Sequence, residues 1–429
     1  MRLLRGALRD VFDVRRGEIR ICVHASIVFF LIIAGHTVLE TVRDTLLLAQ
    51  LPLSRLNLMY VSVAGLTFLV NAVASGIARR LGHRRTLVGL LVFAACASSV
   101  LRFLPSCEYV ACTVYLVSGL LVTVLASQFW LHSAQLLTRE QGGRLFSLIA
   151  TGGTAGGILG AELASHVLRC RPVMSLLPLA AACFLLGALA LCAVQSEDAP
   201  ASPSQPRDNA ASGQSYVARV VGLVLLSTAA LLIVDYLFKS TIAARIPASR
   251  LGPFFAHFYA AMNVISLGVQ LVGAPLVLRR FGVVGAACIM PALLVIGGGA
   301  SLLGGGSWVF VLGLKAVDAG LRFSLNRVTI ELMYLWVPDN VRARARGVVE
   351  CVVSRVVQAG TGGLLYYLAV RTLATPGVLA LLVIAVSLAW ALLVLSLRRP
   401  HRDLGEPPRV NRSRLDSSSS GLAGERSFP

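Results

Sequence analysis

The chain has 429 residues, of which 56% are hydrophobic and only 14% are charged. Its mean hydropathy of +0.77 excludes an ordinary soluble protein and indicates a polytopic membrane protein. A formal net charge of +19 would suggest a nucleic-acid partner in a soluble chain, but in a membrane protein the placement of the charges matters more. We therefore expect the protein to lie in a lipid bilayer and to have no nucleic-acid partner.

The chain begins with a basic cytoplasmic arm, residues 1–19, and continues with six apolar segments long enough to span a membrane. These spans are predicted at 20–48, 56–78, 86–104, 109–136, 145–167 and 174–194. Residues 20–194 are therefore expected to form an N-terminal six-helix bundle. Residues 195–215, rich in Pro, Ser, Ala and Asp, are predicted to be a flexible cytoplasmic linker.

A second block of six spans follows the linker, at 216–244, 254–278, 283–303, 307–335, 345–370 and 374–397. Residues 216–397 are expected to form a C-terminal six-helix bundle. Residues 398–429 are polar, Ser-rich and Arg-rich, and are predicted to be a disordered basic tail. The predicted fold class is an all-α polytopic membrane protein with about 12 transmembrane helices.

The arginines in the loops, in the terminal segments and at the ends of the spans lie mostly on one side of the predicted membrane. If the N-terminus is cytoplasmic, 26 of them fall on the cytoplasmic side and 7 on the opposite side. Because cytoplasmic loops carry the excess of Lys and Arg, both termini are predicted to be cytoplasmic. The expected location is a cell membrane or an inner membrane, as a multi-pass integral protein.

The two blocks are similar to each other in sequence. An offset of 195 residues places Glu40 on Asp235 and Asp44 on Lys239. Duplicated six-helix bundles joined by a cytoplasmic linker are typical of transporters built from parallel repeats, whose substrate site lies between the halves near the midplane. The repeat therefore predicts two pseudo-symmetric bundles with a site between them.

The densest cluster of charges inside an apolar segment lies at 307–335. On a helix, Lys315, Asp318 and Arg322 fall on one narrow stripe, and Arg327 with Glu331 form a separate i,i+4 pair. A charge at the bilayer centre costs roughly 2.5–3.5 kcal/mol, so such residues persist where they pair, line a cavity or have a function. We expect the stripe to face a central cavity.

Two further spans carry charges on one face. The first has Glu40, Arg43 and Asp44, and the seventh has Asp235 and Lys239 at an i,i+4 spacing. The first, fourth, seventh and tenth helices line the cavity in this architecture, so these charges are expected to meet the stripe of the tenth. One interpretation is a set of ion pairs that locks the halves in register. The other is a polyanion site, in which arginine grips phosphate bidentately and lysine acts as a point charge.

The polyanion interpretation gives each charged residue a predicted role. The predicted substrate-binding residues are Arg43, Asp235, Lys239, Lys315 and Arg322. The predicted residues for charge pairing or coupling in the cavity are Glu40, Asp44 and Asp318. Five residues toward the cytoplasm are predicted to form a gate or to meet arriving substrate: Arg327, Glu331, Arg342, Arg344 and Arg346.

The glycine-rich stretch TGGTAGGILG, residues 151–160, could suggest a phosphate-binding loop. It lacks the GK[ST] ending and lies inside an apolar span, which favours GxxxG packing against a neighbouring helix. The sequence GTGG at 360–363 occupies the equivalent place in the second block. The nine cysteines lack metal-ligand spacing, and nothing resembles a catalytic triad or a nucleotide-hydrolysis motif. We expect no enzyme activity, no metal and no cofactor.

Four stretches of the chain carry a family resemblance: ETVRDTLLLA, QFWLHSAQLLTREQGGRLFSLIATGGTAGGILGA, VDYLFKSTIAARIP and LRFSLNRVTIELMYLWVPDNVRARARGVVECVVSR. Together they resemble the nucleotide transporter family of bacterial and plastid ATP:ADP antiporters, a branch of the major facilitator fold. The resemblance extends over about residues 15–397. It implies exchange of nucleotides across a membrane by alternating access, with the phosphates held by cations in the cavity.

Individual positions match this family unevenly. Where the ATP/ADP exchangers carry a lysine followed by an aspartate in the first helix, this chain has Arg43 and Asp44. Their acid-x-x-x-lysine motif in the seventh helix matches Asp235 and Lys239. Ser118 stands where the exchangers have a glutamate in the fourth helix, which leaves open whether ATP and ADP are the substrates.

Three functions are consistent with the sequence. The first is a secondary transporter, expected to be monomeric, that exchanges nucleotides or another phosphorylated anion by alternating access. The second is a general major-facilitator carrier of a drug or amphiphile, coupled to protons through Glu40, Asp44 or Asp235. The third is a non-transporting membrane protein whose charged stripes are structural locks and whose basic tail binds partners or anionic lipid.

Overall fold

The computed structural model describes residues 18–105, 107–137, 139–193, 214–334 and 353–397, and every regular element within them is a helix. The first half of the chain contains α2 (Ile19–Gln50), α3 (Leu53–Leu81), α4 (His83–Leu101), α5 (Glu108–Leu136), α6 (Arg139–Leu168), η1 (Val173–Ser175) and α7 (Leu176–Ala193). The second half contains α8 (Gln214–Ala243), α9 (Ala248–Gly268), η2 (Val269–Gly273), α10 (Ala274–Leu303), α11 (Trp308–Leu321), η3 (Arg322–Asn326), α12 (Arg327–Tyr334), α14 (Ser354–Val370) and α15 (Pro376–Ser396).

Eight helical segments of the described residues are long and apolar enough to cross a membrane. One of them is continuous from Ala248 to Leu303 and bends at Gly282, whose φ of 66° lies in the left-handed region that favours glycine. The bend separates the spans predicted at 254–278 and 283–303. The predicted spans outside these eight segments correspond to α6, to α11 through α12, and to α14. Each predicted span therefore contains helix.

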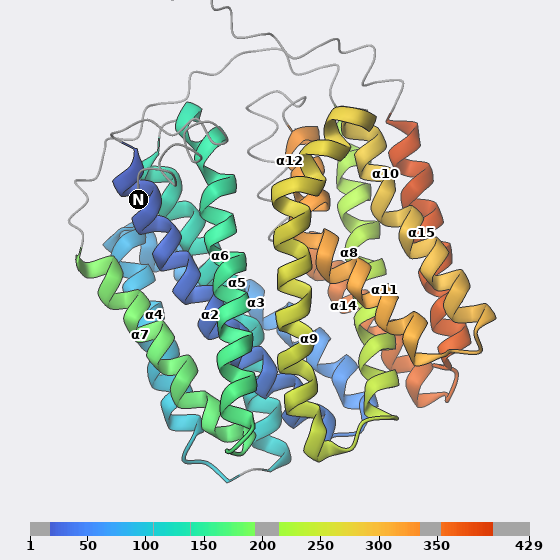
Figure 1. The fold of residues 1–429 in the computed structure, drawn as a ribbon, viewed down its shortest axis with the longest axis horizontal. Coiled ribbons are helices and arrows are strands. Elements are labelled where there is room, and N and C mark those ends of the chain that lie inside the picture. The colour runs from blue at the N-terminus through green and yellow to red at the C-terminus, as the bar shows by residue number, and fades with distance from the viewer. Residues whose placement is uncertain (1–17, 106, 138, 194–213, 335–352, 398–429) are drawn as a thin grey trace, which may run out of the picture.

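The helices form two groups that stand side by side, α2 to α7 in one and α8 to α15 in the other (Figure 1). In the first group α2 contacts α5, α6 and α7, and in the second α8 contacts α11, α14 and α15. Ile32 and Leu39 of α2 are fully buried in the core. Leu69 and Leu392, on outward faces, expose 62% and 66% of their surface, as expected for side chains that meet lipid. The predicted arm, linker and tail lie almost wholly outside the described residues.

The helix ends lie on two sides of the molecule. The first residue of α2 and the last residue of α15 lie on one side, called the terminal side below, which is uppermost in Figure 1. The turns that connect α2 to α3, α8 to α9 and α14 to α15 lie on the opposite side, called the distal side. These two names describe the fold without reference to a cellular compartment.

Glycines let α6 approach two neighbouring helices closely. A Cβ added at Gly156 would press on the backbone carbonyl group of Phe30 in α2. A Cβ added at Gly157 would lie 2.8 Å from the side chain of Asn263 in α9, which belongs to the other half. This close approach confirms that residues 151–160 are a packing motif. It also makes α6 a link between the halves.

The second glycine motif, 360–363, also contributes to the contact between the halves. A Cβ added at Gly362 would lie 3.2 Å from Tyr60 and Val61 of α3, whereas one at Gly360 or Gly363 would have no atom within 4 Å. One glycine of this motif therefore serves close packing of α14 against α3.

Gly156→Ala is expected to destabilise the fold by about 1–3 kcal/mol, because the new methyl group would press on a backbone carbonyl that cannot rotate away. Gly89→Ala in α4 is the matched control, since a Cβ there has no atom within 4 Å. We expect that control to be neutral or more stable by up to about 1 kcal/mol. Thermal unfolding of both purified variants in detergent measures the difference, and equal stability would contradict the close contact between α6 and α2.

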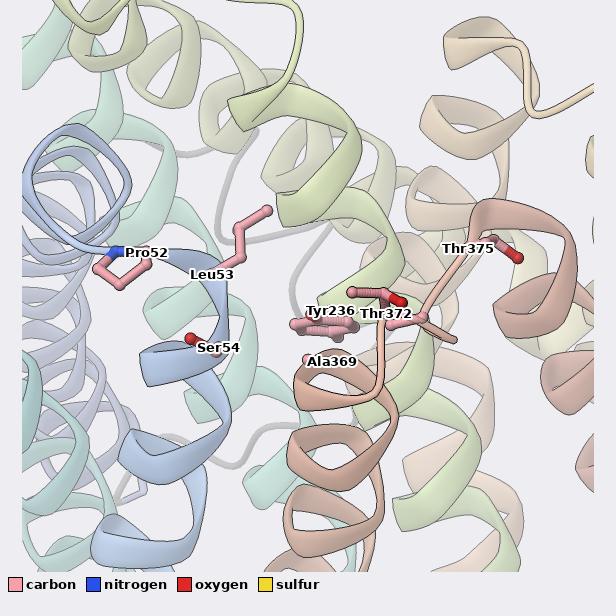
Figure 2. Close-up of a pocket in the computed structure, with 8 residues that line it drawn as sticks. Pro52, Leu53, Ser54, Tyr236, Ala369, Thr372 and Thr375 are labelled. Carbon is pink, nitrogen blue, oxygen red and sulfur yellow. The ribbon is translucent and has the colours of Figure 1, made fainter.

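A hollow of about 360 Å³ lies between the halves on the distal side (Figure 2). Pro52, Leu53 and Ser54, at the start of α3, line one side of it, and Tyr236 of α8 and Thr372 of the turn after α14 line the other. The residues that line this hollow carry no charge.

Candidate functional site

Charged side chains of α2, α8, α11 and η3 form one continuous network of ion pairs between the two halves. In order along the network they are Glu40, Arg43, Asp44, Lys239, Asp235, Lys315, Asp318 and Arg322. Helical spacing of three or four residues puts the members from each helix on one face. The structure thus brings together every residue predicted for substrate binding or for charge pairing in the cavity.

The first-half end of the network is built on α2. Arg43 donates hydrogen bonds to Glu40 and to Oδ1 of Asp44, both at 2.8 Å. Oδ1 of Asp44 lies 3.1 Å from Nζ of Lys239 on α8, and this ion pair joins the two halves. Asp44 and Lys239 are also the two positions that the 195-residue offset relates. Because residues related by a twofold axis meet only near that axis, the pair lies close to the pseudo-twofold axis of the fold.

The second-half end is built on α8 and α11. Nζ of Lys239 lies 3.0 Å from Asp235, which Nζ of Lys315 contacts at 2.7 Å. Lys315 also donates to Asp318 at 2.9 Å. Asp318 accepts two hydrogen bonds from Arg322, at 2.9 Å from Nε and at 2.7 Å from Nη2. This two-bond grip is the geometry with which arginine binds carboxylates and phosphates.

The helix changes its winding at Arg322, the first residue of the π-helical turn η3. A second π-helical turn, η2, packs against it. Such turns are rare and occur frequently at functional sites. Because a π-helical turn holds more residues than an α-helical one, the charged stripe does not continue at α-helical spacing beyond Arg322.

The middle of the network is buried and its two ends are more open. The side chains of Asp44 and Asp318 are 0% exposed, and that of Lys239 is 3% exposed. Glu40 and Arg322, at the two ends, are 27% and 32% exposed. Buried charges are tolerated when each has well-placed partners, and the shared contacts in the middle supply them. A molecule that enters the site would meet the ends first.

The network is charge-balanced, because its four cations are matched by four acids. The sequence left two interpretations open, a set of ion pairs between the halves and a set of cations facing a cavity. In the structure each of the four cations contacts at least one carboxylate, as the first interpretation expects: Arg43, Lys239, Lys315 and Arg322. Each cation of the network therefore has a carboxylate partner of the protein before any ligand is bound.

Two tyrosines that no sequence pattern predicted hold the carboxylates in the middle of the network. The hydroxyl group of Tyr60 on α3 donates to Oδ2 of Asp235 at 2.7 Å. The hydroxyl group of Tyr259 on α9 donates to Oδ2 of Asp44. Each bond runs from the second span of one half to the first span of the other half. The two tyrosines therefore add a crossed pair of contacts between the halves.

A third tyrosine contributes its ring to the site. The ring of Tyr115 on α5 lies 5.1 Å from the guanidinium group of Arg43 and 5.8 Å from Nζ of Lys239. Cations at such distances are attracted by the aromatic face. A tyrosine inside an apolar span is usually interpreted as a packing residue. The sequence therefore did not predict that any of the three tyrosines contacts the charged network.

Tyr60→Phe and Tyr259→Phe are each expected to destabilise the protein by about 1–3 kcal/mol, because a buried carboxylate loses a hydrogen-bond donor. Tyr109→Phe is the control, since Tyr109 is 82% exposed. Thermal unfolding in detergent of the three variants measures the effect. If all three variants unfold at the same temperature as the unaltered protein, the two hydroxyl groups do not hold the carboxylates.

The predicted gate is described only in part. Arg327 and Glu331 on α12 form the expected i,i+4 ion pair at 3.0 Å, and their side chains are 53% and 35% exposed. They lie on the terminal side of Arg322. Three predicted gate residues lie outside the described residues: Arg342, Arg344 and Arg346. Their role stays a prediction.

No family model and no curated protein matches the sequence. Solved transporter structures are similar to the chain in three dimensions. A D-xylose-proton symporter has a TM-score of 0.64 and 14% identity, covering 87% of this chain and 96% of its own. The nucleoside transporter NupG has a TM-score of 0.62 and 14% identity, covering 88% and 98%. The xylose transporter XylE from E. coli, in an inward open conformation, has a TM-score of 0.62 and 15% identity, covering 87% and 95%.

These similarities, which extend over nearly the whole length of the solved chains, show the fold. The protein is an all-α polytopic membrane protein with the major-facilitator fold, built from two pseudo-symmetric bundles. The predicted fold class is therefore confirmed. At such low identity the similarities show the fold alone, and the resemblance to the nucleotide exchangers stays a prediction.

Proposed function

We propose that the protein is a secondary transporter that carries a small phosphorylated anion, such as a nucleotide, by alternating access and exchanges it for a counter-substrate. The observation that carries this proposal is the pair of hydrogen bonds from Arg322, the partly exposed end of the network, to the buried carboxylate of Asp318. The carboxylate of Asp318 occupies the position that a phosphate group of the cargo would take. Lys315, 2.9 Å from Asp318, supplies a second positive charge there.

The position of the network suits a protein that alternates between two arrangements of its halves. The Asp44–Lys239 ion pair and the hydrogen bonds of Tyr60 and Tyr259 all join one half to the other. Opening the distal side would break these contacts. An anion bound to the second-half cations would offset part of that cost if it binds the open arrangement more tightly.

The proposed orientation assigns a direction to this opening. With both termini in the cytoplasm, the distal side faces outward. Asp44 lies six residues before the end of α2 at Gln50, or about 9 Å along the helix axis, so the network closes the path in the outer half of the membrane. In this proposal the cargo reaches Arg322 from the cytoplasmic side.

A second candidate is a carrier of an uncharged molecule, such as a nucleoside or a sugar. The charge balance of the network favours it, because the four cations already contact carboxylates of the protein. In this candidate, protons coupled through Glu40, Asp44 or Asp235 would drive uptake. The solved structures similar to this chain include a nucleoside transporter and a xylose-proton symporter.

Uptake into proteoliposomes separates the two candidates. Vesicles preloaded with each unlabelled compound are given the same compound in labelled form, from a panel of ATP, ADP, a hexose phosphate, a nucleoside and xylose. Uptake confined to the phosphorylated compounds and insensitive to a proton gradient supports the first candidate. Uptake of an uncharged compound that depends on the gradient supports the second. No uptake of any compound by folded protein would contradict both and favour a structural role for the network.

A further inference from the structure

Each cation of the network has a carboxylate partner on its own helical segment. The pairs are Arg43 with Glu40 and Asp44, Lys239 with Asp235, and Lys315 and Arg322 with Asp318. Within the network, the ion pair between Asp44 and Lys239 is the one that joins the halves. When the halves separate on the distal side, every cation therefore keeps an acid that moves with it.

The network leaves each half with a net formal charge of one unit, and the two net charges are opposite in sign. The first-half members are two acids and one cation, with a formal charge of −1. The second-half members are two acids and three cations, with a formal charge of +1. Separation of the halves thus leaves one unit of charge on each face and leaves none of the four cations without a carboxylate.

This arrangement affects how the carrier returns when no cargo is bound. A buried ion without a partner carries a penalty of several kcal/mol. Each addition of about 1.4 kcal/mol to a barrier slows the step tenfold. A carrier whose cavity holds unmatched cations can therefore close only around an anionic cargo, which makes exchange obligatory. Here the acids of the protein neutralise the cations in the absence of cargo.

We propose that the empty carrier reorients, so that net transport of the anion proceeds without a counter-substrate. This inference rests on the proposed function, because it concerns the same site and the same class of cargo. The protein would exchange anions when both sides are loaded, and it would also fill or empty a compartment down a gradient.

Labelled ADP, or the hexose phosphate if the panel above favours it, is offered to two sets of proteoliposomes. One set is preloaded with the unlabelled compound and the other is empty, and K⁺ with valinomycin holds the membrane potential at zero. We expect uptake into empty vesicles at an initial rate within about tenfold of the preloaded rate. Uptake that requires preloading would overturn the inference and leave the proposed function standing. Absence of uptake in both sets would overturn the proposed function, and the inference with it.

Asp318→Asn tests the acids of the network directly. The change removes the carboxylate that contacts Arg322 and Lys315 but keeps the size of the side chain. We expect the ratio of net uptake to exchange to fall by about tenfold or more, because only an anion bound from a loaded compartment can then supply the missing negative charge. A ratio equal to that of the unaltered protein would overturn the inference.

Glu108→Gln is the matched control for this experiment. Glu108 pairs with Arg55 near the distal surface, where the side chains are 40% and 49% exposed, and it lies outside the network. Its ratio of net uptake to exchange should be unchanged, because exposed ion pairs contribute little. A folding defect would lower the rates of net uptake and of exchange by the same factor. The ratio of the two rates therefore distinguishes a folding defect from the proposed effect. If Asp318→Asn does not fold, the comparison of empty and preloaded vesicles with the unaltered protein decides.

Discussion

Asp44→Asn is expected to destabilise the protein by about 3–5 kcal/mol, because it removes a buried negative charge that two buried cations share. Asp44 is 0% exposed and lies 2.8 Å from Arg43 and 3.1 Å from Lys239. Tyr259 also donates a hydrogen bond to it. Thermal or denaturant-induced unfolding of the purified protein in detergent measures the loss. The loss should exceed that of either tyrosine variant, since a charge is lost in addition to a hydrogen-bond acceptor.

Removing the opposite charge provides the control. In Asp44→Asn/Lys239→Met the buried cation is replaced by an apolar side chain, so we expect the double variant to recover about 1–3 kcal/mol relative to simple addition of the two single losses. Asp235 loses Lys239 in this variant but keeps its contacts with Lys315 and Tyr60. The two single variants and the double variant form a cycle. Losses that add without a coupling term would contradict a direct ion pair between the halves.

The helices and their order could be predicted from the sequence because length and apolar character largely determine a membrane span. The bend at Gly282 falls between two predicted spans, where the apolar pattern is interrupted by Arg279 and Arg280. The glycine motif at 151–160 predicted close packing, but it did not identify α2 and α9 as the neighbours. Those neighbours depend on how all the helices pack, which no local pattern specifies.

The charged members of the site could be predicted because charges inside apolar spans are costly and therefore conspicuous. The pairing between helices was harder to predict. Contacts within one helix, such as Arg322 with Asp318, follow from i,i+4 spacing. The contact between Asp44 and Lys239 was implicit in the 195-residue offset, because equivalent positions near a twofold axis meet each other. The contact between Lys315 and Asp235 depends on the placement of α11 against α8, which the sequence does not specify.

Two features of the site were not predictable from residue types. Tyr60 and Tyr259 become part of the network only because their hydroxyl groups reach carboxylates of the other half. The sequence supplied the four acids and the four cations, but only the structure showed that they join into one network that spans both halves. Paired acids bear on the proposed chemistry of the site: in the proposed mechanism an anion would replace Asp318 at Arg322, because the cations already contact carboxylates of the protein.

Arg322→Lys is expected to raise the KM for the phosphorylated cargo by about 10–100-fold, with a smaller change in the maximal rate. Lysine keeps the positive charge but loses the planar fork that makes two hydrogen bonds, and a hydrogen bond to a charged group contributes about 1.5–3 kcal/mol. Because lysine and arginine both carry one positive charge, the net charge of the network is unchanged. Asp318 also keeps Lys315, which lies 2.9 Å away, as a partner. Initial rates of uptake into preloaded proteoliposomes, measured against cargo concentration, give the KM.

Arg55→Lys is the matched control for this prediction, because Arg55 also pairs with an acid but lies 49% exposed near the distal surface. Its KM should equal that of the unaltered protein. Uptake of an uncharged nucleoside, if the protein carries one, provides a second control, since that cargo has no phosphate for Arg322 to grip. An unchanged KM in Arg322→Lys would reduce Arg322 to a structural partner of Asp318. A rise of equal size for charged and uncharged cargo would indicate a change in the whole site, because a lost phosphate contact affects only the cargo that carries a phosphate.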